Sequence, residues 1–121
     1  TPKEFQPDKS VVKVSQNLTG IELTTDPLKA AKNADVVVTD TYSSIHNVDP
    51  KRMKKFLPKY QVNGRIMGIA DENAIFLHCL PAKREQEVTS SVIDGPQSLV
   101  WDEAENRLHT QKALLCALLH A

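Results

Sequence analysis

Cysteine is scarce in this chain, with only Cys79 and Cys116 among 121 residues. Two cysteines do not build the disulfide framework of a small secreted domain, and no further ligand pattern near either one indicates a zinc site. We therefore expect a protein of the reducing cytoplasm that holds no metal ion.

Long apolar runs and an excess of one charge are also missing. No segment approaches the roughly 20 apolar residues that cross a bilayer, and residues 1–4 lack the basic and apolar order of a signal peptide. The 15 basic and 15 acidic side chains cancel, so no strong field attracts the protein to nucleic acid or to a membrane. These absences favour a soluble protein that binds a small molecule or another protein.

Familiar catalytic signatures are absent as well. The sequence has neither a glycine-rich phosphate loop nor a recognisable Ser-His-Asp arrangement. The basic run at 51–55 is best interpreted as a solvated helix face, with Met53 and Phe56 pointing inward. With 121 residues, the chain has room for one domain with its own core.

Alternating helix and strand signals predict an α/β domain with a mainly parallel sheet and helices on both faces. The β-branched run at 36–38 is typical of a buried parallel strand. The other expected strands are 21–25, 75–78 and 99–101. Helices are expected at 9–19, 27–33, 51–59, 60–70 and 87–93, and from 102 onward.

Aspartates mark the starts of several of these helices. Asp8 can cap its helix by accepting hydrogen bonds from the first amides, and Asp26 and Asp49 each precede a proline that starts a helix. Asp102 and Glu105 resemble a capping box for the last helix. In that helix, the following side chains are expected to form a core-facing stripe: Leu108, Gln111, Leu114, Leu115, Leu118 and Leu119.

Polar residues lie at the ends of three predicted strands. Asp40 and Ser44 follow one, His78 and Cys79 close another, and Arg107 lies beyond the third. Because parallel strands end at the same edge of a sheet, these groups should converge on one crevice. A carboxylate, free main-chain carbonyls beside a Leu-Pro bond that can be cis, and a guanidinium suit an amine next to an anion.

Each of these residues also has an ordinary structural interpretation. Asp40 can cap a turn, Cys79 can be a small buried hydrophobe, and His78 can be a core histidine. Arg107 can pair with Glu103, one helical turn before it. Residue types and spacing leave these alternatives open.

A set of motifs in this chain resembles the ornithine carbamoyltransferase family. They are TDTYSS at 39–44, YQVN at 60–63, HCLP at 78–81 and EAENR at 103–107. Their order and spacing match the second half of the family from about Thr1 to the end, and the cysteine of HCLP argues against the aspartate-specific relatives. The resemblance implies an incomplete Rossmann-like fold: residues 1–121 form the C-terminal ornithine-binding domain, incomplete at its N-terminal edge, without a carbamoyl phosphate domain.

The resemblance also implies a reaction. A carbamoyl group passes from carbamoyl phosphate to the side-chain amine of L-ornithine, which gives L-citrulline and phosphate in arginine metabolism. It implies no metal, no organic cofactor, and a homotrimer in the complete enzyme. Because the Ser-Thr-Arg-Thr phosphate loop of the family is absent here, the chain alone is expected to be inactive.

For the amino acid, the resemblance implies that Asp40 holds the ornithine amino group and that Ser44 and Ile45 line the site. The family has Ser-Met-Gly where this chain has Ser44, Ile45 and His46. If the lost glycine has a positive φ, the loop that closes over ornithine is strained by this change. Putrescine or an acylated ornithine is therefore an alternative substrate.

For the carbamoyl group, the resemblance implies that the main-chain carbonyls of Cys79 and Leu80 bind its amide. Arg107 binds its oxygen and steadies the charge that grows in the transition state, and His78 belongs to the same substrate-binding group. Asp40 and Cys79 assist removal of the amine proton, since only a neutral amine attacks.

A stand-alone amino-acid-binding domain, or a degenerate domain without catalysis, is the alternative from another class. The start without methionine and the apolar end at 114–119 suggest neighbouring segments. The plainer interpretation is a trimmed chain whose last helix packs on its own sheet.

Overall fold

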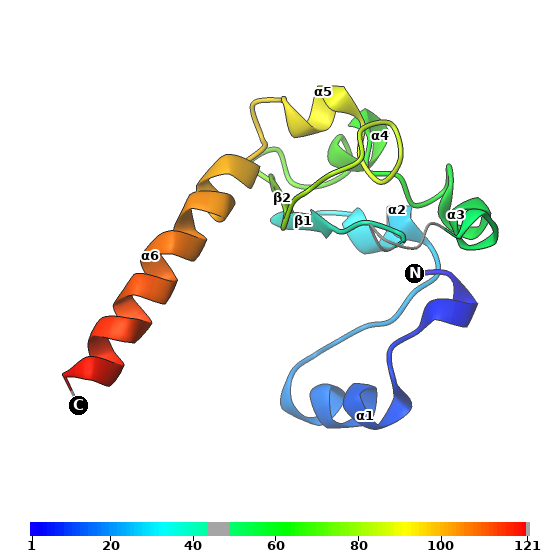
Figure 1. The fold of residues 1–121 in the computed structure, drawn as a ribbon. Coiled ribbons are helices and arrows are strands. Elements are labelled where there is room, and N and C mark those ends of the chain that lie inside the picture. Colours follow the sequence, from blue (N-terminus) through cyan, green and yellow to red (C-terminus); the bar gives the residue numbers. More distant parts are fainter. Residues whose placement is uncertain (44–48, 121) are drawn as a thin grey trace.

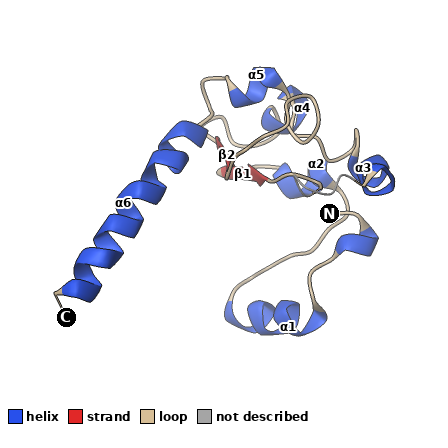
Figure 2. Cartoon of the chain, viewed as in Figure 1, coloured by secondary structure: helices blue, strands red, loops and turns tan. Residues whose placement is uncertain are grey.

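A computed structural model describes residues 1–43 and 49–120 of the chain. Two parallel strands lie among short helices, and one long helix leaves the body (Figures 1 and 2). The elements are η1 (Lys3–Phe5), α1 (Lys9–Leu18), α2 (Pro27–Ala31), β1 (Val36–Thr39), α3 (Pro50–Phe56), α4 (Gly64–Met67), β2 (Ile75–His78), α5 (Ser90–Ile93) and α6 (Val100–Leu119). This mixture of helices and parallel strands confirms the predicted α/β class.

The sheet pairs β1 with β2 in parallel, from Val36 opposite Ile75 to Thr39 opposite His78. Phe76 is fully buried in the core, and Val37 faces the same interior. Val36 and Val38 are 46% and 63% exposed, because alternate side chains of a strand point to opposite faces and the described residues leave that face open. The predicted burial of this strand is therefore right for its middle residue only.

Three of the predicted helix starts are confirmed by their caps. The side chain of Asp8 accepts from Ser10 N at 2.8 Å, and Asp26 and Asp49 act in the same way at the starts of α2 and α3. Each carboxylate binds an amide that has no partner inside its helix. Each cap acts only on amides two or three residues away, so the start of these helices is set by local sequence.

Two predicted strands are not formed in the described part of the chain. Residues 21–25 form neither a helix nor a strand, and they pair with no described strand. At 99–101, helix α6 has already begun, and a single parallel bridge between Phe76 and Ser98 is all that pairs there. Leu99 is the N-cap, so Asp102 and Glu105 lie inside the helix and the expected capping box is wrong.

The helix expected at 60–70 shrinks to α4. Asn63 caps it, with Oδ1 accepting from Arg65 N at 3.0 Å and Ile66 N at 3.2 Å, and Gly68 ends it. Glycine is a poor helix residue, and the one at position 64 stands at the first turn, where this cost is smallest. The prediction found a helix here but not its short length.

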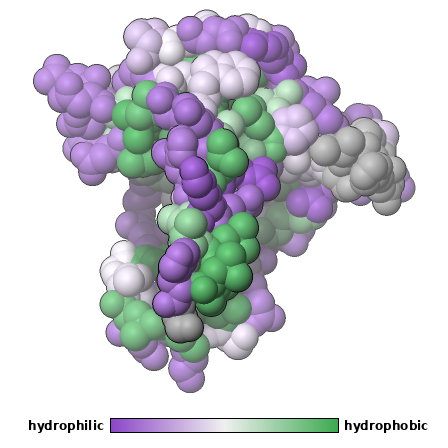
Figure 3. All heavy atoms as spheres, turned by 60° about the vertical axis from the view of Figure 1, so that its left-hand side comes forward, coloured by the Kyte–Doolittle hydropathy of each residue, from purple (hydrophilic) through white to green (hydrophobic). Residues whose placement is uncertain are grey.

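Helix α6 extends away from the sheet (Figure 1). Val100 is its only buried residue, and apolar side chains gather on its open surface (Figure 3). The expected core-facing stripe is therefore wrong: among its leucines, Leu114 is 58% and Leu119 81% exposed. Beyond its first turns, no described segment packs against this helix. No helix in the described residues is long and apolar enough to cross a membrane.

Candidate functional site

The ends of β1 and β2 lie side by side because the strands are parallel and in register. The residues that follow, Asp40 and Cys79, are both exposed, and the Cys79 thiol donates to Asp40 Oδ1 at 3.3 Å. The expected meeting of these strand ends is found. The idea that Cys79 is a buried hydrophobe is wrong.

Asp40 combines a structural and a chemical role. Its Oδ1 accepts the N–H of the next residue, Thr41, at 2.6 Å, which holds the carboxylate against its own main chain. This bond, assisted by the Cys79 thiol, holds the pKa of the Asp40 carboxyl below its usual value. The carboxylate is therefore charged at neutral pH and available to a cation.

Cys79 has the opposite shift. Partial burial, followed by the hydrogen bond and charge of Asp40 and by the charge of Glu103, raises the pKa of the Cys79 thiol. At neutral pH the thiol keeps its proton and acts as a donor. The implied help of Cys79 in removing the amine proton stays a prediction, and the raised pKa means that Cys79 begins as a thiol.

The side chain of His78 is fully buried. Its Nδ1 accepts the Leu80 N–H at 2.9 Å, and its own main-chain N–H donates to Glu103 Oε2 at 2.9 Å. Nε2 lies 3.3 Å from Oε1 of the buried Glu87. The ring thus lies in the core, as in the structural interpretation, and supports the turn. Its implied membership of the substrate-binding group stays a prediction.

The turn after β2 has an unusual backbone. Leu80 has a φ of 53°, a left-handed conformation that is costly for residues other than glycine. The Leu80–Pro81 bond is cis, the form that the sequence left open. The bond to His78 Nδ1 therefore holds Leu80 in a conformation that it would not adopt unaided.

A cleft of about 790 Å³ lies between this turn and α6. Cys79, Leu80 and Pro81 line one part of it, and Trp101 and Arg107 line another. The structure thereby brings Arg107 to the same cleft as the HCLP motif, as expected. Among the described residues no ion pair joins Arg107 to Glu103, whose carboxylate instead accepts the main-chain N–H of His78.

Two of the predicted site residues, Ser44 and Ile45, lie outside the described residues, as does the altered His46. Glu87 and Glu103, by contrast, were not singled out for a role in the site. The first glutamate of EAENR was a signal for Glu103, but nothing in the local pattern marks Glu87, whose partner is nine positions away.

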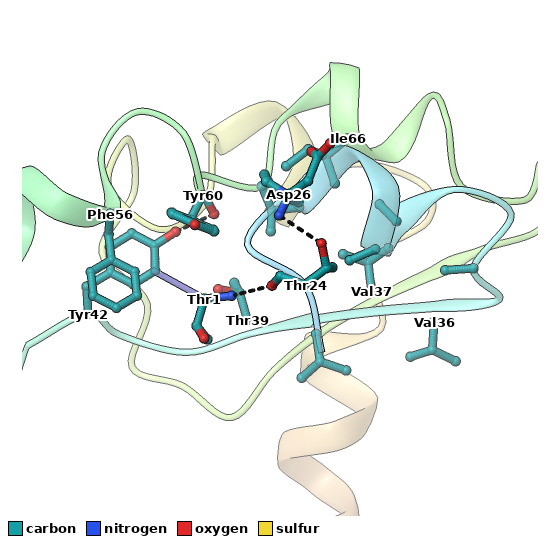
Figure 4. Close-up of a pocket in the computed structure, with 16 residues that line it drawn as sticks. Thr1, Thr24, Asp26, Val36, Val37, Thr39, Tyr42, Phe56, Tyr60 and Ile66 are labelled. Atoms are coloured by element: carbon teal, nitrogen blue, oxygen red, sulfur yellow. Dashed lines mark hydrogen bonds between the residues drawn. The ribbon is translucent and has the colours of Figure 1, made fainter. Parts of the chain in front are cut away.

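A second pocket, of about 300 Å³, runs along β1 (Figure 4). The ring of Tyr42 stacks on Phe56, with centroids 4.5 Å apart, and its hydroxyl donates to the carbonyl of Tyr60. Burial raises the pKa of Tyr42 well above its usual value. Tyr42 therefore anchors residues 39–43 of the TDTYSS motif, and none of the predicted site residues that the structure describes lines this pocket.

Asp40, His78 and Cys79 also place possible metal ligands within 4.8 Å of one another. Both ring nitrogens of His78 are already directed at protein groups, namely the Leu80 N–H and Glu87. The cluster is therefore not a ready-made metal site. The expectation of no cofactor stays a prediction.

Comparisons with known proteins show which family the chain resembles. The family described as aspartate/ornithine carbamoyltransferase, Asp/Orn binding domain, matches residues 1–118. An ornithine carbamoyltransferase from Cenarchaeum symbiosum is 61% identical over 118 residues, which cover 98% of this chain and 39% of that protein.

Solved structures give the same result. Ornithine carbamoyltransferase from Pyrococcus furiosus has a TM-score of 0.85 and 45% identity, with 95% of this chain and 39% of that chain covered. The anabolic ornithine carbamoyltransferase from Campylobacter jejuni has a TM-score of 0.88 and 32% identity, with coverages of 100% and 42%. The chain spans about two fifths of the length of these relatives. With a family match over residues 1–118, the chain belongs to the aspartate/ornithine carbamoyltransferases, in which it corresponds to the Asp/Orn binding domain.

Proposed function

We propose that this chain is the ornithine-binding part of a carbamoyltransferase that converts carbamoyl phosphate and L-ornithine to L-citrulline and phosphate. The observation that carries the proposal is the charged Asp40 beside the protonated Cys79 at the end of the parallel sheet. The 61% identity to a protein named ornithine carbamoyltransferase supports ornithine as the amine. The reaction needs no metal or organic cofactor.

In this proposal Asp40 holds the amino group of the substrate, because a charged carboxylate attracts an ammonium ion. Its lowered pKa makes it a weak base, so it orients the amino group and is not the final acceptor of the proton. The side-chain amine attacks the carbamoyl carbon in its neutral form, the bond between that carbon and the phosphate oxygen breaks, and the attacking nitrogen loses one proton, which ends on the departing phosphate.

The carbamoyl group is placed by the turn after β2. The main-chain carbonyls of Cys79 and Leu80 accept from its amide, and Arg107 donates to its oxygen as negative charge develops there. The shared cleft supports this arrangement. The groups that bind the phosphate come from parts of the complete protein other than these 121 residues.

The test is an assay of citrulline formation by the complete protein that contains this chain. We expect activity with L-ornithine, and we expect Asp40→Asn to lower kcat/KM by about 100-fold or more, since an oriented charge is lost. Asp8→Asn is the matched control, because asparagine caps a helix about as well as aspartate. Putrescine and N-acetylornithine compete in the same assay, and preferred turnover of either one would replace ornithine as the substrate.

No citrulline or other carbamoylated product from any of these amines would contradict the enzymatic proposal. Saturable ornithine binding without turnover would then favour an amino-acid-binding domain.

We further propose that the complete protein is a cytoplasmic homotrimer of arginine biosynthesis. The family resemblance supports this, and light scattering from the purified complete protein tests the trimer directly. A mass of three chains is expected, and a monomer would contradict it.

A further inference from the structure

A buried carboxylate lies directly beneath the HCLP turn. The side chains of Glu87 and His78 have no solvent exposure, and Glu87 Oε1 is 3.3 Å from His78 Nε2, without the alignment of a full hydrogen bond. Neither group reaches the cleft. Burying a carboxylate in this way destabilises the fold unless neighbouring groups donate hydrogen bonds to it or carry the opposite charge.

The hydrogen bonds determine where the protons are. Since the Leu80 N–H donates to His78 Nδ1, that nitrogen carries no proton, and a neutral ring must carry its proton on Nε2. Nε2 faces the Glu87 carboxylate, which favours this tautomer. The same carboxylate oxygen accepts the main-chain N–H of Lys83.

These contacts hold the segment 80–83 at both of its ends. Leu80 N is bound to one side of the imidazole, and Lys83 N is bound to the carboxylate on its other side. The left-handed φ of Leu80 needs such support. We name this pair, Glu87 with His78, the carboxylate–imidazole clamp.

Stability alone does not explain the clamp. Glu87 Oε2 is buried without a hydrogen-bond partner, and an unpartnered buried carboxylate oxygen destabilises the fold. Replacing buried charges by apolar residues of similar size is often neutral or stabilising. The location of the clamp suggests another use, because the residues that it holds line the cleft with Arg107.

We propose that Glu87 is a positioning residue of the transfer reaction: through the tautomer of His78 it fixes the main chain of Cys79 and Leu80 that faces the substrate. The inference rests on the proposed function, and it adds a residue that never touches the substrate. Glu87 acts only through His78 and the turn.

The test compares two substitutions in the complete protein. Glu87→Gln keeps the shape and an acceptor oxygen, whereas Glu87→Leu leaves the Lys83 and His78 donors without one. Glu85→Leu is the matched control: Glu85 is exposed, accepts the Ser90 N–H at 2.8 Å, and does not touch His78. Kinetics are measured at a temperature at which circular dichroism shows every variant to be folded.

We expect kcat/KM to fall about 100-fold in Glu87→Leu, because a displaced main chain misaligns the reactants, and to stay within about threefold in Glu87→Gln and Glu85→Leu. NMR of ¹⁵N-histidine-labelled protein, assigned with His78→Asn, should show His78 with its proton on Nε2 in the wild type and in Glu87→Gln. This tautomer should be lost in Glu87→Leu.

Wild-type His78 with its proton on Nδ1, or as imidazolium, overturns the clamp. A folded Glu87→Leu with unchanged kcat/KM overturns the positioning role. If Glu87→Leu does not fold, the proposal is judged from the His78 tautomer of the wild type and from the activity of Glu87→Gln. A large fall of kcat/KM in Glu87→Gln with an unchanged His78 tautomer also contradicts the proposal. A wild-type protein without transferase activity would contradict both the proposed function and the positioning role. Its His78 tautomer would still show whether the clamp forms.

Discussion

At the residue scale, Asp40 and Cys79 change each other's acidity across one 3.3 Å contact. The carboxylate is one of the causes that raise the pKa of the thiol, and the thiol is one of the donors that lower the pKa of the carboxyl. The pair therefore remains as carboxylate and thiol through the neutral range. In that state it presents one negative charge, which suits a cationic amine.

This coupling predicts that Asp40→Asn shifts the reactivity of Cys79 to lower pH. The raised pKa means that the thiolate forms only above the pH at which an ordinary cysteine ionises, and removing the neighbouring negative charge removes part of the cause. Iodoacetamide labelling of the Cys79 peptide, followed by mass spectrometry from about pH 7 to about pH 10, measures the shift. Glu105→Gln is the control, and identical profiles for wild type and Asp40→Asn would contradict the coupling.

At the element scale, Asn63 starts the short helix α4 by accepting two of its amides. Helix α4 supplies the buried side chains of Ile66 and Met67 to the core. A helix this short has little stability of its own. Its cap therefore matters more than it does in a long helix.

We predict that Asn63→Ala destabilises the complete protein by about 1 kcal/mol, the usual cost of losing an N-cap. Asn63→Ser keeps an acceptor oxygen and should stay within a few tenths of a kcal/mol of the wild type. Thermal unfolding monitored by circular dichroism measures both. Equal losses for alanine and serine would show that the cap bonds are not what Asn63 contributes.

Element ends set by neighbouring residues were predictable, whereas those set by distant ones were not. Asp8 and the other capping aspartates act on amides two or three positions away, so the sequence alone identifies them. Residues 21–25 were predicted as a strand from their alternation, but a strand exists only beside a partner. The leucines of α6 have a helical period, which shows an apolar face but not what covers it.

In the candidate site, too, some contacts were predictable from the sequence and others were not. Asp40 and Cys79 meet because strand ends in a parallel sheet share an edge, and the sequence was sufficient for that inference. The contact of Glu87 with His78 depends on how the chain returns after the turn, and no local pattern shows this path. The protonation of Cys79 likewise became clear only with its neighbours in place.

At the scale of the whole molecule, the chain leaves apolar surface open on a sheet and on a long helix. We predict that the 121-residue chain, expressed alone, self-associates, because in the described part of the chain β1 is an edge strand with one side unpaired and with exposed valines on its open face. Val38→Lys places a charge at this edge, where Val38 is 63% exposed, and should raise the concentration at which light scattering detects association. Val11→Lys is the matched control: Val11 is 58% exposed but lies on α1, away from the sheet.

If the edge strand β1 drives association, only Val38→Lys reduces it. Equal effects of the two lysines would attribute association to general hydrophobicity, and a monodisperse monomer at about 100 μM, within the range where such surfaces usually aggregate, would contradict the prediction.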